Sequence, residues 1–156
     1  MSSLISPHGG ELKSLFLSTA EAEAEKKAAQ DNKIWKLTHR QICDIELLLN
    51  GGFSPLEGFM SQADYEAVLE NMHLTDGTLW PMPITLDVND NFATSVSTGD
   101  TISLADPEGY LIATMEISDK WQPDKKHEAV KVFSTDDLPT LRSLTFTNTD
   151  SVATSI

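Results

Sequence analysis

The chain has 156 residues, a length that suits one domain. Its 24 acidic residues outnumber its 11 basic residues, and the net charge of −13 repels phosphate backbones and anionic lipids. This charge argues against a broad nucleic-acid or membrane surface. The single cysteine, Cys43, excludes a disulfide within the chain and a cysteine-based zinc site.

Two absences point to the compartment. No apolar run approaches the roughly 20 residues of a membrane span. The N-terminal segment MSSLISPHGGELKSLF lacks the basic start and the continuous apolar core of a signal peptide. We therefore expect a cytoplasmic protein in which Cys43 is reduced and is a small buried residue on a helix.

The first part of the chain predicts helices. After a turn at 7–10, STAEAEAEKKAAQDN consists of strong helix formers behind a cap at Ser18 or Thr19, with little to bury. THRQICDIELLLNGG is the clearest helix, because Thr38 and Gln41 have capping-box spacing and Gly51 follows as a stop. Its apolar residues recur at helical spacing: Ile42, Ile45, Leu48 and Leu49.

A third helix is predicted in SQADYEAVLENM. Ser61 is its cap, and its core side comprises Tyr65, Val68, Leu69 and Met72. After Met72 the pattern becomes extended. Asp76-Gly77 is a hairpin-type turn signal.

Short strands with tight turns follow. Strands are predicted at Thr85–Val88 and Thr101–Leu104 and in YLIATMEI; the NDN at 89–91 and the DPEG at 106–109 are predicted as turns. PDKKHEAVKVF is a short helix opened by Pro123 and Asp124, and the last ten or so residues are expected to form a loose tail. The order predicts an α+β domain around a small, mostly antiparallel, barrel-like sheet with flanking helices.

Motifs for catalysis or metal binding are missing. No two of His8, His39, His73 and His127 are three to five residues apart, and there is no P-loop, dinucleotide loop or G-x-S-x-G elbow. The densest basic cluster, KKHEAVK, is interpreted as a solvated helix face. We therefore assign no catalytic residue, no cofactor and no metal.

The segment NGGFSPLEGF runs from Asn50 to Phe59 and invites a phosphate-loop interpretation. It follows a helix instead of a strand, and no lysine is placed to meet a phosphate. Ser54 precedes a proline and has no evident base beside it. We interpret Asn50, Gly51 and Gly52 as the helix exit, Phe53, Leu56 and Phe59 as side chains that hold the loop to the core, and Pro55 and Gly58 as its turns.

Several ordered stretches carry a resemblance to a family. PHGGEL, RQICDIELLLNGGFSPLEGFM, ADYEAVLENMHLTDGTLWPMPITLDV, DPEG and PDKKHEAVKVF together resemble the N-terminal region of sulfate adenylyltransferases. The resemblance covers roughly Leu4 to Phe133. It identifies the segment at 50–59 as part of a structural family signature.

The resemblance implies a fold and a division of the chain. It implies a PUA-like domain, a small β-barrel with added helices, which we place at residues 1–137, with a polar tail at 138–156. In the family a separate catalytic domain carries Q-x-R-N and H-x-x-H motifs, and this sequence has neither. The family reaction joins ATP and sulfate to give adenosine 5′-phosphosulfate and pyrophosphate.

The implied role is therefore non-catalytic. We expect a scaffold or interface domain, inactive alone, whose partners are the catalytic domain or other subunits of a sulfate-activating enzyme, with homo-oligomers left open. Neither nucleic acid nor membrane is expected as a partner. The alternative is a free-standing PUA-like module that binds RNA or a small regulatory ligand.

Overall fold

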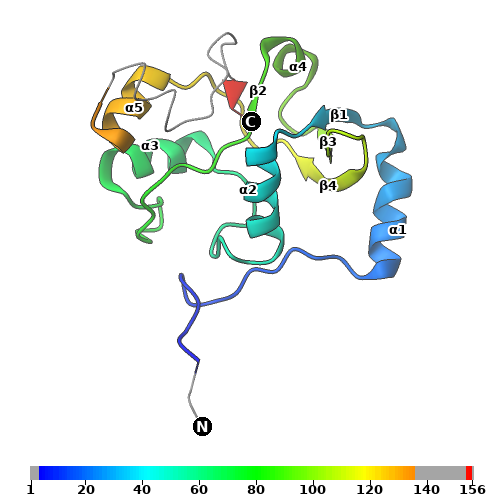
Figure 1. Cartoon of the computed structure of the whole chain (residues 1–156), viewed down its shortest axis with the longest axis horizontal. Coiled ribbons are helices and arrows are strands. Elements are labelled where there is room, and N and C mark those ends of the chain that lie inside the picture. The colour runs from blue at the N-terminus through cyan, green and yellow to red at the C-terminus, as the bar shows by residue number, and fades with distance from the viewer. Residues whose placement is uncertain (1–3, 136–153, 156) are drawn as a thin grey trace. The chain divides into compact units, whose positions relative to one another are not determined.

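The computed structural model describes residues 4–135 and 154–155, with the elements labelled in Figure 1. The chain divides into two compact units, each made of two separate stretches of sequence. The first unit comprises Met1–Phe59 and Thr101–Met115, and the second comprises Met60–Asp100 and Glu116–Ile156. The predicted boundary at residue 137 lies outside the described residues.

Helix α1, Thr19–Ala28, begins the regular structure of the first unit and runs into a 3₁₀ turn at Ala29–Asp31. Ser18 and Glu21 form a reciprocal capping box, which confirms the predicted start. None of its residues is buried, as expected for a surface helix. Glu25 accepts a hydrogen bond from the Thr114 hydroxyl at 2.9 Å.

Helix α2, His39–Leu49, has the predicted capping box between Thr38 and Gln41. Ile45 and Leu48 are buried on its inner side, as their spacing predicted. Cys43 is exposed, so the expectation that it is buried is wrong. It lies one residue outside the i, i+3, i+4 pattern that faces the core.

The first unit also holds a small sheet in the order β1-β3-β4. Strand β1 is Lys33–Lys36, β3 is Thr101–Ala105 and β4 is Leu111–Glu116. Strand β1 runs parallel to β3, with Trp35 opposite Leu104, so the sheet is mixed where a mostly antiparallel one was predicted. The predicted turn at 106–109 joins β3 to β4, and Gly109 has φ +100°.

Helix α3, Gln62–Asn71, begins the second unit and is capped by Ser61 as predicted. Tyr65, Val68 and Leu69 are buried. Met72 was expected on the same side, but it ends the helix in a left-handed conformation with its side chain 56% exposed. The predicted hairpin follows. Gly77 in its turn has φ +87°, and an antiparallel β-bridge pairs the residues on either side of the turn, 73 and 79.

The next elements differ more from prediction. Strand β2 is only Asp87–Val88; Thr85 and Leu86 are both buried, so the expected alternation fails. The NDN segment is not a turn, because Asn89 caps helix α4, Asp90–Ser95. Helix α5, Lys125–Phe133, starts at the expected cap, Asp124.

The expected C-terminal tail is described in part. Strand β5, Thr154–Ser155, pairs antiparallel with β2. Residues 136–153 and residue 156 lie outside the described residues, so the loose-tail expectation for them stays a prediction.

Each unit has its own buried residues. In the second unit, the rings of Tyr65 and Trp121 lie 5.6 Å apart with a 53° tilt, and Leu69 and Val132 pack with them. In the first unit, buried apolar residues come from both of its stretches of sequence: Ala29, Leu37, Ile45, Leu48, Leu56, Ile102, Leu104 and Ala105. The two stretches of the first unit are joined by the pairing of β1 with β3.

Candidate functional site

The segment Asn50–Phe59, here called the elbow, turns the chain away from the end of α2. Gly51 is buried and has φ +82°, a conformation that L side chains rarely adopt. A Cβ atom at Gly51 would lie 2.9 Å from Leu12 Cδ1. Helix α2 ends at Leu49, where the helix exit was predicted, and the left-handed backbone of Gly51 favours glycine there.

Ser54 closes the elbow from inside. Its buried hydroxyl donates to the Gly51 carbonyl oxygen at 2.6 Å and accepts from the Lys13 backbone N–H at 2.9 Å. Its peptide bond to Pro55 is cis. With both interactions taken up by backbone groups, the Ser54 hydroxyl has a structural role.

The residues Pro7–Leu15, here called the strap, lie along the elbow. A Cβ atom at Gly9 would lie 2.8 Å from Pro55 Cβ, and the Leu15 N–H donates to the Leu49 carbonyl at 2.9 Å. The sequence singled out PHGGEL and the elbow separately. The structure brings them together, although no local pattern in either segment predicts the contact.

Lys13 adds an ionic contact between strap and elbow. Its Nζ lies 3.0 Å from Glu57 Oε1 and 3.1 Å from Glu11 Oε2. The hydrogen bond that Lys13 donates to Glu57 raises the pKa of Lys13, and the one that it donates to Glu11 raises it further. The sequence analysis did not single out Lys13 or Glu57, because the two residues are 44 positions apart in the sequence and share no motif.

The apolar residues of the elbow differ in burial. Leu56 is buried, whereas Phe53 and Phe59 are half-buried, which supports all three as contacts to the interior. Gly58 has no neighbouring atom within 4 Å of a Cβ position, and its φ lies outside the left-handed region. Nothing around Gly58 therefore requires glycine.

The backbone N–H groups of the elbow already have partners. Gly51 donates to Leu48 O, Gly52 to Asn50 Oδ1, Phe53 to Leu47 O and Ser54 to Gly51 O, at 2.8–3.3 Å. A phosphate cradle needs such groups turned toward the ligand. These four N–H groups are therefore not available to an anion.

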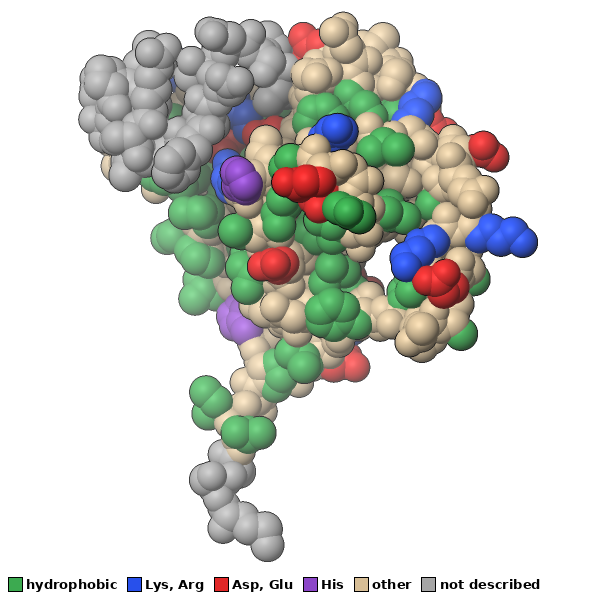
Figure 2. Space-filling view, turned by 45° about the vertical axis from the view of Figure 1, so that its right-hand side comes forward, with side chains coloured by type: hydrophobic (Ala, Val, Ile, Leu, Met, Phe, Trp, Pro, Cys, Tyr) green, Lys and Arg blue, Asp and Glu red, His purple; other side chains and the backbone are tan. Residues whose placement is uncertain are grey.

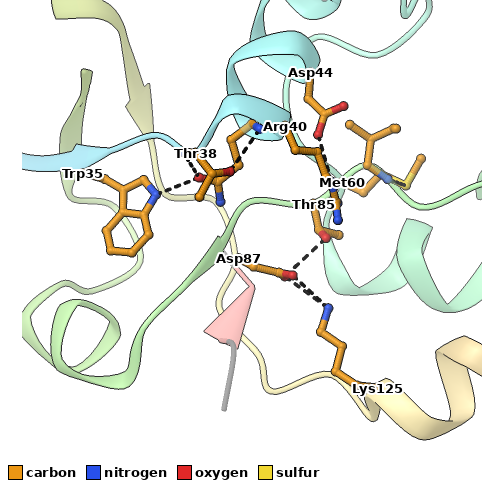
Figure 3. A network of polar contacts seen from close by, with 10 residues as sticks. Trp35, Thr38, Arg40, Asp44, Met60, Thr85, Asp87 and Lys125 are labelled. Carbon is orange, nitrogen blue, oxygen red and sulfur yellow. Dashed lines mark hydrogen bonds and ion pairs between the residues drawn. The ribbon is translucent and has the colours of Figure 1, made fainter. Parts of the chain in front are cut away.

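A second polar cluster lies in the other unit, and Figure 3 shows its pair Lys125 and Asp87. Lys125 Nζ lies 3.0 Å from Asp87 Oδ2 and 3.1 Å from Glu128 Oε2, and Glu128 Oε2 accepts from the Tyr65 hydroxyl at 2.9 Å. Burial raises the pKa of Tyr65, and the Glu128 carboxylate raises it further. The phenol therefore stays protonated, and the cluster joins β2, α3 and α5.

The basic residues of α5 have a role that the sequence did not predict. Glu70 of α3 lies 2.7 Å from Lys131 Nζ and 3.1 Å from His127 Nε2. KKHEAVK was interpreted as a solvated helix face, and the structure adds that three of its residues pair with carboxylates of other elements or of α5 itself.

One buried carboxylate oxygen of the first unit lacks a hydrogen bond. Asp44 Oδ2 is buried and lies 3.7 Å from Arg40 Nε (Figure 3), beyond hydrogen-bond distance. Burial raises the pKa of Asp44, against the opposing charge of Arg40. In residues 4–135 and 154–155, no group of three or more histidine, cysteine or acidic side chains could hold a metal ion.

No helix within the described part of the chain is long and apolar enough to cross a membrane. A family profile described as "PUA-like domain" matches residues 5–153. The chain belongs to this PUA-like family.

The chain matches the N-terminal portion of sulfate adenylyltransferases. The chain is 50% identical over 135 residues to the sulfate adenylyltransferase of Eremothecium gossypii, covering 86% of this chain and 27% of the relative. It is 44% identical over 133 residues to that of Saccharomyces cerevisiae, covering 83% and 26%. The chain thus spans about a quarter of the length of these relatives.

A solved structure has the same fold over most of the chain. It is the hexameric APS kinase from Thiobacillus denitrificans, with a TM-score of 0.71 and 37% identity. The match covers 78% of this chain and 24% of that chain.

Proposed function

We propose that this chain is a non-catalytic N-terminal domain of a sulfate-activating enzyme, with a scaffold or interface role. One observation carries the proposal. The match to sulfate adenylyltransferase takes up 86% of this chain but only 27% of the relative. The Q-x-R-N and H-x-x-H motifs implied for the catalytic domain are absent from all 156 residues.

The described side chains support a structural role. Joining ATP to sulfate requires cationic donors aimed at phosphate and sulfate oxygens. In the strap, Lys13 is held between two carboxylates, and in the second unit Lys125 is held likewise. Around these clusters we propose a small PUA-like β-barrel with flanking helices. Its partners would be the catalytic part, or other subunits, of the enzyme.

The direct test is a coupled pyrophosphate-release assay with ATP and sulfate. We expect no turnover from this chain alone under conditions in which the full-length Eremothecium gossypii enzyme is active. Turnover by the isolated chain would contradict the proposal. Binding of labelled RNA that weakens steeply with salt would instead support an RNA-binding module, and calorimetric binding of ATP or adenosine 5′-phosphosulfate would support a small-ligand module.

A further inference from the structure

Two exposed leucines lie over the consecutive glycines of the elbow. Leu12 Cδ1 lies 2.9 Å from the Cβ position of Gly51, and Leu47 Cδ2 lies 2.9 Å from that of Gly52. Leu12 is 58% exposed and Leu47 is 37% exposed. The two leucines thus cover consecutive glycines, and they are here called the elbow patch.

More apolar surface adjoins the patch along the chain. The Leu15 N–H bond to Leu49 O holds the end of the strap on α2, and the next residue, Phe16, is 67% exposed. Figure 2 shows hydrophobic side chains at the surface along the N-terminal segment, at the bottom of the view. Exposed apolar residues that adjoin one another mark interaction sites more often than scattered ones do.

The charges around the elbow patch are mainly acidic. Glu11 and Glu57 are exposed on the strap and the elbow, and Glu46 is exposed on α2 next to Leu47. Lys13 is the one basic residue of the strap and elbow, and it already lies within 3.1 Å of Glu11 and Glu57. A partner that covers the leucines therefore needs basic groups at its edges.

The same charges disfavour self-association through this surface. Two copies facing each other would bring like acidic rims together, and the whole chain has a net charge of −13. We propose that the elbow patch docks an apolar segment flanked by lysine or arginine in the part of a sulfate-activating enzyme that this chain does not span. This inference rests on the proposed function and adds to it the contact surface and the chemistry of the partner.

The test uses a chimera in which this chain replaces the matching portion of the Eremothecium gossypii enzyme. Leu12→Glu and Leu47→Glu are compared with Val130→Glu, a matched control on helix α5 with a 46% exposed side chain. Each variant is also made in the isolated chain. We expect the patch variants to lower the melting temperature of the chimera by at least about 3 °C more than that of the isolated chain. The control should shift both proteins equally.

A second pair of variants tests the charge. Glu46→Lys should destabilise the chimera more than the isolated chain, and the difference should shrink as salt is raised, because exposed charges are screened. Glu108→Lys, an exposed residue of the β3–β4 turn, should show no such difference.

The outcomes separate the two proposals. A chimera without turnover contradicts the proposed function and with it the docking surface. A working chimera in which the patch variants behave like Val130→Glu overturns the docking surface alone. If the isolated chain with Leu12→Glu fails to fold, the patch belongs to the core, and the docking surface is again overturned. A dimer of the isolated chain that Leu12→Glu abolishes would assign the patch to a second copy and also overturn the inference.

Discussion

In the first unit, backbone groups close the elbow: glycine conformations, amide-to-carbonyl bonds and a serine hydroxyl between two backbone atoms. In the second unit, a lysine, two carboxylates and a phenol join β2, α3 and α5. The elbow depends on glycine, a residue without a side chain, at Gly51. The cluster of the second unit depends on side-chain charge.

This difference predicts how each unit responds to change. Backbone closure should be insensitive to salt and pH but intolerant of added Cβ atoms. Charge pairing should tolerate small changes of shape but respond to protonation and ionic strength. The four predictions below test this contrast, from the largest expected effect to the smallest.

Gly51→Val should be the most damaging. It places a β-branched residue at φ +82° and a Cβ atom 2.9 Å from Leu12 Cδ1. The left-handed backbone, with the Lys13 carbonyl oxygen 3.1 Å from the new Cβ atom, should cost about 2 kcal/mol in the free energy of unfolding, measured by urea denaturation. Gly58→Ala, at an open position, should cost little. Equal losses for the two variants would refute the role given to Gly51.

Tyr65→Phe should have the next largest effect. It removes the 2.9 Å hydrogen bond to Glu128 while keeping the ring against Trp121. A bond to a charged acceptor predicts a loss of about 1.5 kcal/mol, measured by thermal unfolding. Tyr110→Phe is the control, because that side chain is 74% exposed. If both variants melt together with the unchanged protein, the cluster does not stabilise the second unit.

Ser54→Ala should cost about 1 kcal/mol, because it removes both hydrogen bonds of a buried hydroxyl. The loss should be the same at low and high salt, since no charge is removed. Ser14→Ala, on an exposed strap residue, serves as the control in the same denaturation series. A loss that varies strongly with salt would contradict a backbone-based closure.

Glu70→Gln should have the smallest effect, and it should depend on pH. The hydrogen bond from Lys131, followed by that from His127, lowers the pKa of Glu70 below its usual 4.5. A lowered pKa in the folded state means that the ionised group stabilises the fold above pH 4.5, and that this stabilisation is lost as the pH falls through the folded-state pKa. The variant should therefore melt slightly below the unchanged protein at pH 7 and equal it in acid.

Glu108→Gln is the control for that pH series. A difference between Glu70→Gln and the unchanged protein that persists at pH 2 would show that the effect does not come from the ionised carboxylate.

Local signals predicted much of the helical structure. Ser18, Thr38, Ser61 and Asp124 all cap helices as expected, because a cap and the residues it bonds are three or fewer positions apart. Helix α4 was missed although Asn89 is a good cap. Its six residues, DNFATS, are too few to show an apolar period.

Contacts between distant residues were not predictable in this way. Strand β1 is only KIWK, and it pairs with a strand almost 70 positions later. The strap contacts Ser54 across 41 positions. The positive φ of Gly51 was foreseen from the helix that precedes it, whereas the leucine packed against it belongs to a segment whose own pattern is irregular.

The pairing of β1 with β3 has a consequence for synthesis of the chain. Because the first unit needs Thr101–Met115, it cannot be completed until the ribosome has also made Met60–Asp100, and the second unit in turn needs residues after Met115. Neither unit can fold as an uninterrupted N-terminal piece during translation. For the same reason, no single contiguous piece of the chain contains the whole of one unit and nothing of the other.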